Sequence, residues 1–311
     1  MKDYIGSVRF FKNLILLLVI IFIAVPTAFS ISYRAKMSDL KKELEEQTQI
    51  NREQTQKSEE LQQTVEELEE MLSSHRIDPD GAEYQKLYPD FYAPQPLCAM
   101  TKESKVIYLT FDDGPSKRTP EVLQILREEN VKATFFVIGR SDEQSKQWMR
   151  DIVSEGHTIA MHSYTHDYDD IYASVEDYLD DMYRIFTLIK ETTGVTPTVF
   201  RLPGGSINGY NYEVYQDIIS EMLRRGFVPY DWNISSGDAS SSSPTPVDKI
   251  LSNVLNKAGS ISRGVVLMHD ASAKTTTVAA LRPMIQSLRS MGFRFDCLKP
   301  ETAPVLWAYD H

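Results

Sequence analysis

Hydrophobic and polar residues follow three different patterns along the chain. Residues 13–33 form an apolar run without a charged side chain. Residues 36–75 are strongly charged, with leucine and valine at heptad spacing near the two ends. From residue 104 onward, short β-branched and aromatic runs alternate with longer stretches of helical periodicity. The patterns predict a transmembrane anchor within residues 1–35, a helical stalk over residues 36–75 and an α/β domain over residues 104–311.

The apolar run is long enough to cross a bilayer, because about 20 helical residues span the hydrocarbon core. Lys2, Arg9 and Lys12 precede the run, and basic residues favour the cytoplasmic side. We therefore predict a single-pass anchor in the cell membrane, with the rest of the chain extracellular. A cleavable signal peptide, processed near Ala28, is the alternative and also exports the chain.

The charged segment carries 5 basic and 11 acidic residues between Lys36 and Ser74. Its heptad register is apolar at both ends, whereas the middle core positions are polar: Gln47, Asn51, Gln54 and Ser58. This register indicates either a coiled coil that makes the protein a homodimer or a solvated single helix. Residues 76–103 contain four prolines and are predicted to be a linker or an amino-terminal extension.

The third region has the strand–helix alternation of parallel βαβ units, which predicts an α/β fold. Seven strands are expected, at Val106–Phe111, Ala133–Ile138, Thr158–Ser163, Thr198–Leu202, Phe227–Trp232, Val265–His269 and Phe293–Leu298. Helical stretches between them include Pro120–Glu129, Val175–Thr193, Tyr212–Arg225, Val247–Lys257 and Val278–Met291. Either a barrel or an open doubly wound sheet fits this order.

Composition and charge narrow the choice of partners. The net charge of −11 disfavours nucleic acid, because phosphate neutralisation needs an excess of Lys and Arg. Cys98 and Cys297 are the only cysteines, and either a disulfide or two buried thiols fits an exported domain. The tyrosines at 168, 172 and 178 indicate either helix packing or a wall on which carbohydrate stacks.

Candidate catalytic groups follow the strands, where parallel α/β folds build their active sites. Asp112 and Asp113 follow the first strand, and His162 and His166 follow the third. Two imidazoles four residues apart lie on the same side of a helical turn, so they can bind one ion together with a carboxylate from another strand. The set predicts one divalent metal, with Zn favoured and Co, Ni or Mn as alternatives.

Later strand ends carry Arg201-Leu202-Pro203-Gly204-Gly205, the stretch from Trp232 to Asp238, and Leu267-Met268-His269-Asp270. Together with the first two motifs, these resemble the polysaccharide deacetylases, carbohydrate esterase family four, over residues 104–299. The resemblance implies a distorted seven-stranded α/β barrel and a metal ion held by Asp113, His162 and His166. The other implied roles are Asp112 as catalytic base, Arg201 as its orienting partner, the Gly204 N–H as oxyanion donor, His269 as general acid tuned by Asp238, and Trp232, Leu267 and Pro203 as substrate-binding residues.

Two positions depart from the family pattern. Gly204 stands where a bulky residue is usual, which predicts a more open wall of the sugar site. Asp238 is followed by Ala239 rather than by tryptophan, so Asp231 and Asp270 remain competing partners for His269.

The resemblance implies metal-dependent N-deacetylation of a cell-wall glycan. Peptidoglycan N-acetylglucosamine is the expected substrate, because an anchored enzyme reaches only surface polymers. Chitooligosaccharides and O-acetyl xylan are the alternatives within this class, and a catalytically silent wall-binding or scaffold protein is the alternative outside it. The complete set of acidic, basic and imidazole groups favours an enzyme, since binding alone needs no proton-transfer pair.

Overall fold

The structure is a computed structural model in which the chain divides into two compact units, Met1–Arg76 and Ile77–His311. The second unit is described at residues 82–94, 100, 101, 103–239 and 243–309. The first unit is described at residues 11–20, 22, 36, 37, 40–42, 44, 47–49, 51, 52, 54–58 and 62, all of them helical.

The predicted membrane anchor and stalk fall mostly outside these residues. Of residues 1–35, only 11–20 and 22 are described, and among the described helices none is both long and apolar enough to traverse a bilayer. Several heptad positions of the stalk, including Leu61 and Leu68, are also outside the described part. Membrane anchoring and dimerisation therefore stay predictions.

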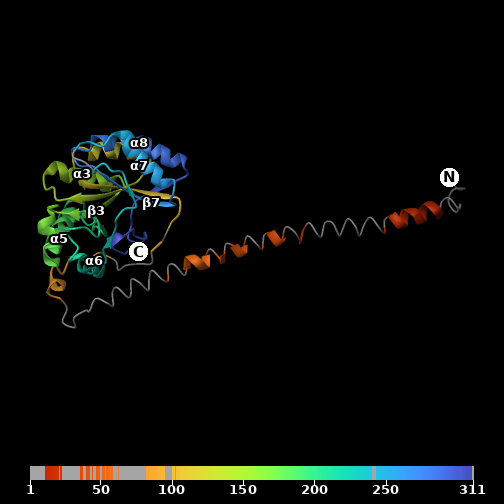
Figure 1. Cartoon of the computed structure of the whole chain (residues 1–311), viewed down its shortest axis with the longest axis horizontal. Helices are drawn as coiled ribbons and strands as arrows, with labels where there is room; N and C mark the ends of the chain where they lie inside the picture. Colours follow the sequence, from red (N-terminus) through yellow and green to blue (C-terminus); the bar gives the residue numbers. More distant parts are fainter. Residues whose placement is uncertain are drawn as a thin grey trace. The chain divides into compact units, whose positions relative to one another are not determined.

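One curled, parallel sheet forms the centre of the Ile77–His311 unit (Figure 1). Along its main path the strands run in the order β5-β4-β3-β2-β1-β7-β6, and β8 pairs with the first half of β1. The bounds are β1 Val106–Gly114, β2 Thr134–Ile138, β3 Thr158–Ser163, β4 Val199–Phe200, β5 Val228–Pro229, β6 Ile234–Ser235, β7 Arg263–His269 and β8 Arg294–Asp296. β1, β2 and β7 are buried almost throughout, as expected for strands that helices cover on one face and the interior covers on the other.

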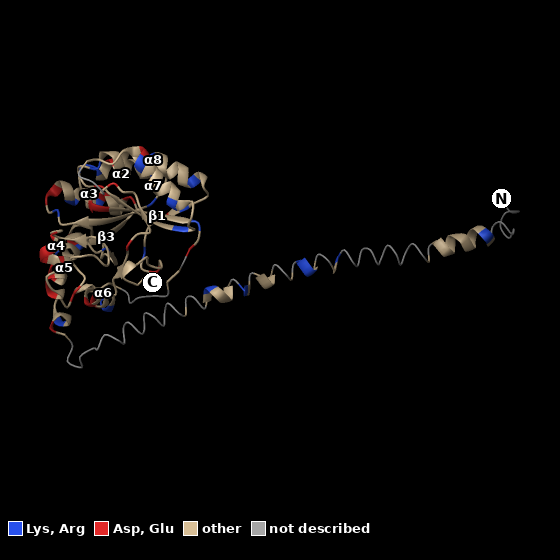
Figure 2. Cartoon of the chain, in the orientation of Figure 1, with Lys and Arg blue, Asp and Glu red and all other residues tan. Residues whose placement is uncertain are grey.

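Helices surround the sheet in an order that their mutual contacts define: α6, α5, α3, α2, α8 and α7 (Figure 1). The bounds are α2 Thr119–Glu128, α3 Glu143–Ser154, α4 Tyr168–Ile171, α5 Val175–Thr193, α6 Tyr215–Arg224, α7 Val247–Ala258 and α8 Thr275–Ser290, with short 3-10 turns η1 at Glu83–Lys86 and η2 at Trp307–Tyr309. The long helix α5 begins where Ser174 accepts a hydrogen bond from the Asp177 N–H and ends at Gly194 in a left-handed conformation. The charged residues of this unit lie mainly on the helices, with both signs interspersed (Figure 2).

The predicted parallel α/β architecture is confirmed, whereas the predicted seven-stranded barrel forms only in part. Strands β5 and β6 are the two ends of the sheet, and no ladder joins them among the described residues. Residues 230–233 instead run directly from one end to the other without a helix. The carboxyl-terminal segment packs there, with the Asp231 N–H donating to the Val305 carbonyl at 2.7 Å. β6 was not predicted, because two residues are too short to give a periodic pattern.

The fold bears on the predicted cysteine pair and on the cluster of tyrosines. Cys297 is buried, but Cys98 lies outside the described residues, so their pairing stays a prediction. Tyr172 and Tyr178 are buried in the core, which favours helix packing for both. Tyr168 is different, because it lies beside the candidate site described next.

Candidate active site

Three potential metal ligands meet at the carboxyl-terminal edge of the sheet. Asp113 is at the end of β1, His162 is in β3, and His166 is in the loop that follows. The Asp113 Oδ1 atom lies 3.5 Å from His162 Nε2 and 3.2 Å from His166 Nε2, and the three ligand atoms are all within 4.8 Å of one another. The structure thus brings together the three residues that the sequence singled out.

The prediction of a helical turn between His162 and His166 is wrong. His162 is extended, whereas His166 has a left-handed backbone with φ of 60°, which is uncommon for residues other than glycine. The buried carboxylate of Asp181 shapes the loop by accepting hydrogen bonds from the Tyr164 and Thr165 N–H groups at 2.7 and 2.8 Å. The end of β3 and the tight loop after it therefore bring the two imidazoles together. Helical periodicity does not position them.

The donor set fits a divalent metal ion. Asp113 Oδ1 is buried without a hydrogen-bond partner in the described part of the chain, so an acceptor atom is left to bind a cation. His162 Nδ1 donates to the Arg201 carbonyl at 2.8 Å, which leaves Nε2 facing Asp113. Such a hydrogen bond on the far ring nitrogen is typical of metal-binding histidine.

The pKa values of these groups follow from burial and mutual attraction. Burial raises the pKa of Asp113, but the close contact with His166 and the charge of His162 outweigh this and hold that pKa well below its usual range. Burial lowers the pKa of His162, which favours the neutral imidazole that binds metals. Burial lowers the pKa of His166, but the contact with Asp113 raises it by more than burial lowers it, so the net shift is upward.

Asp112 lies beside this triad and is held by a buried arginine. Arg201 Nη1 donates to Asp112 Oδ1 and to Thr110 Oγ1, both at 2.8 Å. Its other nitrogens donate to the carbonyls of Tyr230 and Asp231 at 2.8 and 3.0 Å, so the guanidinium is fixed on all sides. The second carboxylate oxygen, Asp112 Oδ2, is 3.9 Å from His162 Nε2 and therefore faces the candidate metal site.

His269 completes the site from β7, opposite Asp112 in the β1–β7 pairing. Its Nδ1 donates to Asp238 Oδ1 at 2.8 Å, and Asp238 Oδ2 accepts from the His269 N–H and from Thr277, also at 2.8 Å each. Burial lowers the pKa of His269, but the Asp238 carboxylate reverses this effect, and the net shift is upward. Of the three candidate carboxylates, it is Asp238 that contacts His269; Asp231 bonds to Ser206 and Trp307, and Asp270 to Thr119.

Replacing Asp238 should change the pH dependence of a reaction that needs protonated His269. The carboxylate raises the pKa of His269, so Asp238→Asn lowers it and leaves less imidazolium at a given pH. The alkaline limb of the kcat/KM profile is expected to move to lower pH, with a larger loss of activity at pH 8 than at pH 6. Rates of acetate release across pH measure this, and an alkaline limb at the wild-type position would contradict it.

The predicted substrate-binding residues lie around this centre. Pro203 accepts a hydrogen bond from the Tyr172 hydroxyl at 2.7 Å, and the following Gly204 has φ of 78°. A Cβ atom at Gly204 would lie only 2.9 Å from the Tyr168 ring. The open wall expected at this glycine is therefore absent, because Tyr168 occupies that side.

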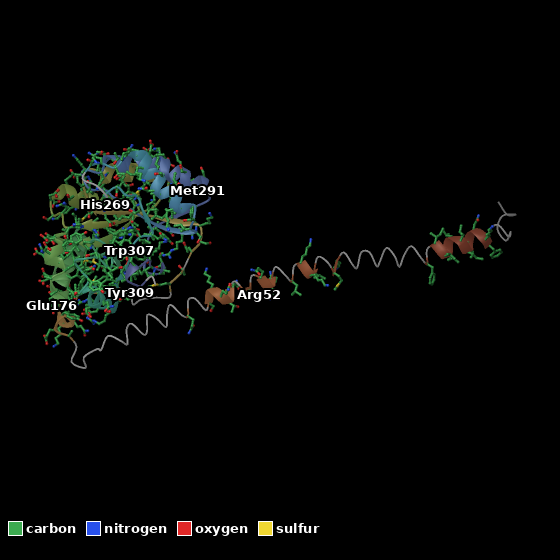
Figure 3. All side chains as sticks on the ribbon, viewed as in Figure 1. Arg52, Glu176, His269, Met291, Trp307 and Tyr309 are labelled. Atoms are coloured by element: carbon green, nitrogen blue, oxygen red, sulfur yellow. The ribbon has the colours of Figure 1, made fainter. Side chains whose placement is uncertain are left out.

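Leu267 comes from β7 and Trp232 from the segment after β5. Leu267 is buried in β7, opposite Thr110 of β1. Trp232 is half-buried in the segment between β5 and β6, 4.2 Å from the Trp307 ring between centroids. In Figure 3, Glu176 on α5 lies at the edge of this unit, whereas His269 and Trp307 lie farther inward.

Sequence reasoning missed several supporting residues. Thr110 precedes Asp112 by two positions, so strand alternation could have placed both on one face. Thr277 and Trp307 had no such signal, because they reach the site from α8 and from the carboxyl-terminal segment. Their contacts depend on tertiary packing.

Comparisons with known proteins agree with this geometry. The polysaccharide deacetylase family matches residues 99–223. A peptidoglycan-N-acetylglucosamine deacetylase of Bacillus cereus is 35% identical over 215 residues, which cover 68% of this chain and 76% of the relative.

Solved structures of deacetylases have a similar fold. The catalytic domain of a peptidoglycan N-acetylglucosamine deacetylase from Eubacterium rectale has a TM-score of 0.64 at 34% identity, over 67% of this chain and 96% of that one. A polysaccharide deacetylase from Bacillus cereus has a TM-score of 0.59 at 34% identity, over 67% of this chain and 98% of the other. The chain belongs to the polysaccharide deacetylase family, carbohydrate esterase family four.

Proposed function

We propose that the protein is a metal-dependent hydrolase that removes N-acetyl groups from cell-wall glycan, with peptidoglycan N-acetylglucosamine as its substrate. The observation that carries this proposal is that three sets of side chains meet at one edge of the sheet. These are the Asp113–His162–His166 donor set, the Asp112–Arg201 pair and the His269–Asp238 pair. Relatives named as deacetylases of the same polymer support the choice of substrate.

The residues of this chain have separable tasks in such a reaction. A divalent ion bound by the donor set supplies a Lewis acid for the amide carbonyl and acidifies water near it. Asp112, oriented by Arg201, accepts a proton from the attacking water at its free oxygen Oδ2. The backbone N–H of Gly204 donates to the oxyanion that develops on the acetyl carbonyl.

His269 acts in the second half of the reaction. With Nδ1 bonded to Asp238, its protonated Nε2 donates a proton to the departing nitrogen as the carbon–nitrogen bond breaks. The products are acetate and a glucosamine unit that remains in the polymer. Trp232, Leu267 and Pro203 are proposed to bind the acetyl group and the sugar.

We further propose that this domain works outside the cell, attached to the membrane. The uncharged run at residues 13–33 and the three basic residues before it support an anchor with this orientation. The charged stalk then holds the domain away from the bilayer, and its heptad pattern supports a homodimer.

Metal removal gives a direct test of the proposal. Treating the full chain with a chelator is expected to abolish acetate release from N-acetylglucosamine polymers, and added Zn, Co, Ni or Mn to restore it, because activity needs the ion held by Asp113 and the two histidines. Acetate assays on peptidoglycan, chitin oligomers and acetylated xylan compare the substrates. A metal-loaded chain that releases no acetate from any acetylated glycan would contradict the proposal that the protein is an enzyme.

A further inference from the structure

An aromatic strip runs from the candidate metal site toward the protein surface. The His166 and Tyr168 rings lie 5.4 Å apart between centroids, and Tyr168 and Tyr210 lie 5.0 Å apart. Exposure rises along the strip: Tyr168 is half-buried, whereas Tyr210 is 60% exposed. Such an exposed aromatic ring beside a reaction centre is available to contact a ligand.

The inner member of the strip is fixed by its fit against Gly204. The Tyr168 ring lies where a side chain at position 204 would begin, with Cε1 only 2.9 Å from the site of a Cβ atom. Its hydroxyl makes no hydrogen bond in the described part of the chain, so it is free to bond to a ligand. Tyr168 therefore forms a wall beside the backbone N–H that is proposed to bind the oxyanion.

The outer member is held by its backbone although its ring is exposed. The Tyr210 N–H donates to the Asn208 Oδ1 atom at 2.8 Å, and the Asn208 amide in turn donates to the carbonyls of Pro203 and Gly205 at 3.2 and 3.3 Å. The Tyr210 ring is thus tied to the same loop that carries Gly204. A loop backbone held in this way loses little conformational entropy when a ligand binds to it.

We propose that Tyr168 and Tyr210 form a glycan subsite, on which the sugar ring next to the reacting N-acetylglucosamine unit stacks. The assignment rests on the proposed deacetylase function, because the strip begins at residues of its reaction centre. A pyranose ring presents an apolar C–H face, which matches the flat face of a tyrosine. The subsite makes the enzyme prefer a polymer to a single sugar.

The test compares oligosaccharide binding by full-chain variants that hold metal. Isothermal titration with a glucosamine tetramer, the deacetylated product, measures binding without turnover. Tyr210→Ala is expected to weaken binding of the tetramer by about fivefold, the loss of one stacking contact, and Tyr210→Trp to retain it. Tyr212→Ala is the matched control, since Tyr212 is 63% exposed on the same loop but contacts Tyr215 instead of Tyr168.

The outcomes separate the subsite from the reaction. Wild-type tetramer affinity in Tyr210→Ala, or an equal loss in Tyr212→Ala, would overturn the subsite. In kinetics, Tyr210→Ala should lose several times more kcat/KM on an N-acetylglucosamine tetramer than on the monomer. A chain that binds the tetramer through Tyr210 but releases no acetate would overturn the proposed reaction and leave the subsite standing.

Discussion

Asp112→Asn is expected to reduce acetate release by about 10²- to 10⁴-fold, the usual contribution of a general base. The asparagine keeps the shape of the side chain but cannot accept the proton of the attacking water. Metal binding is expected to persist, because the donor set uses Asp113, His162 and His166. Metal content per chain and rates of acetate release measure the two effects separately.

The Asp112 variant also disturbs a buried charge, which the experiment must separate from catalysis. Arg201 is fully buried and 2.8 Å from Asp112 Oδ1, and a buried charge without its partner costs about 3–5 kcal/mol of stability. Thermal unfolding therefore accompanies the assay, which is run well below the unfolding midpoint. The control is Asp170→Asn, an exposed carboxylate on α4. A folded, metal-loaded Asp112→Asn protein with wild-type activity would exclude Asp112 as the base.

Glu221→Ala is expected to lower the free energy of unfolding by about 3–5 kcal/mol, the typical result of breaking a buried ion pair. The Glu221 and Arg225 side chains are almost wholly buried, and Arg225 Nε lies 2.6 Å from Glu221 Oε1. Arg225 also donates to four carbonyls of the amino-terminal extension, those of Tyr84, Leu87, Tyr88 and Phe91. Removing the carboxylate leaves the guanidinium charge buried and loosens the extension.

Urea unfolding of this variant and of Glu213→Ala provides the measurement and its control. Glu213 is exposed near the start of α6, and surface substitutions of this kind usually stay within about 0.5 kcal/mol of the wild type. Limited proteolysis should cut the Glu221→Ala protein faster within residues 82–94. Equal urea midpoints for the two variants would show that the ion pair does not stabilise this unit.

Local patterns in the sequence predicted most elements of the sheet and several helices. The bounds of β3 and α5 agree with the predicted Thr158–Ser163 and Val175–Thr193, because both have strong periodicity and clear ends. Helix α3 was not predicted, since its buried face consists of only Ser145, Met149 and Ile152. Such a thin apolar stripe gives a weak signal in the sequence.

The candidate site was predictable as a set of residues but not as a geometry. The spacing of His162 and His166 indicated a shared ligand, yet the loop that joins them is shaped by Asp181 from the middle of α5. The choice of Asp238 over Asp231 depends equally on contacts between distant segments. Only the folded chain shows that Asp231 is already bonded to Ser206 and to the Trp307 N–H.

The contact of Trp307 with the loop after β5 gives the packing beside the candidate site a fixed place in the order of synthesis. The Trp307 N–H donates to Asp231 at 2.7 Å, and its indole N–H donates to the Trp232 carbonyl at 2.8 Å. A ribosome makes residues 305–309 after every group assigned here to the metal, the proton transfers and the substrate. A growing chain that has passed His269 therefore holds the full set of reactive side chains, but Asp231 still lacks a buried donor and Trp232 lacks its neighbour. Packing of the segment that carries Asp231 and Trp232 is therefore completed only after residues 305–309 have been made.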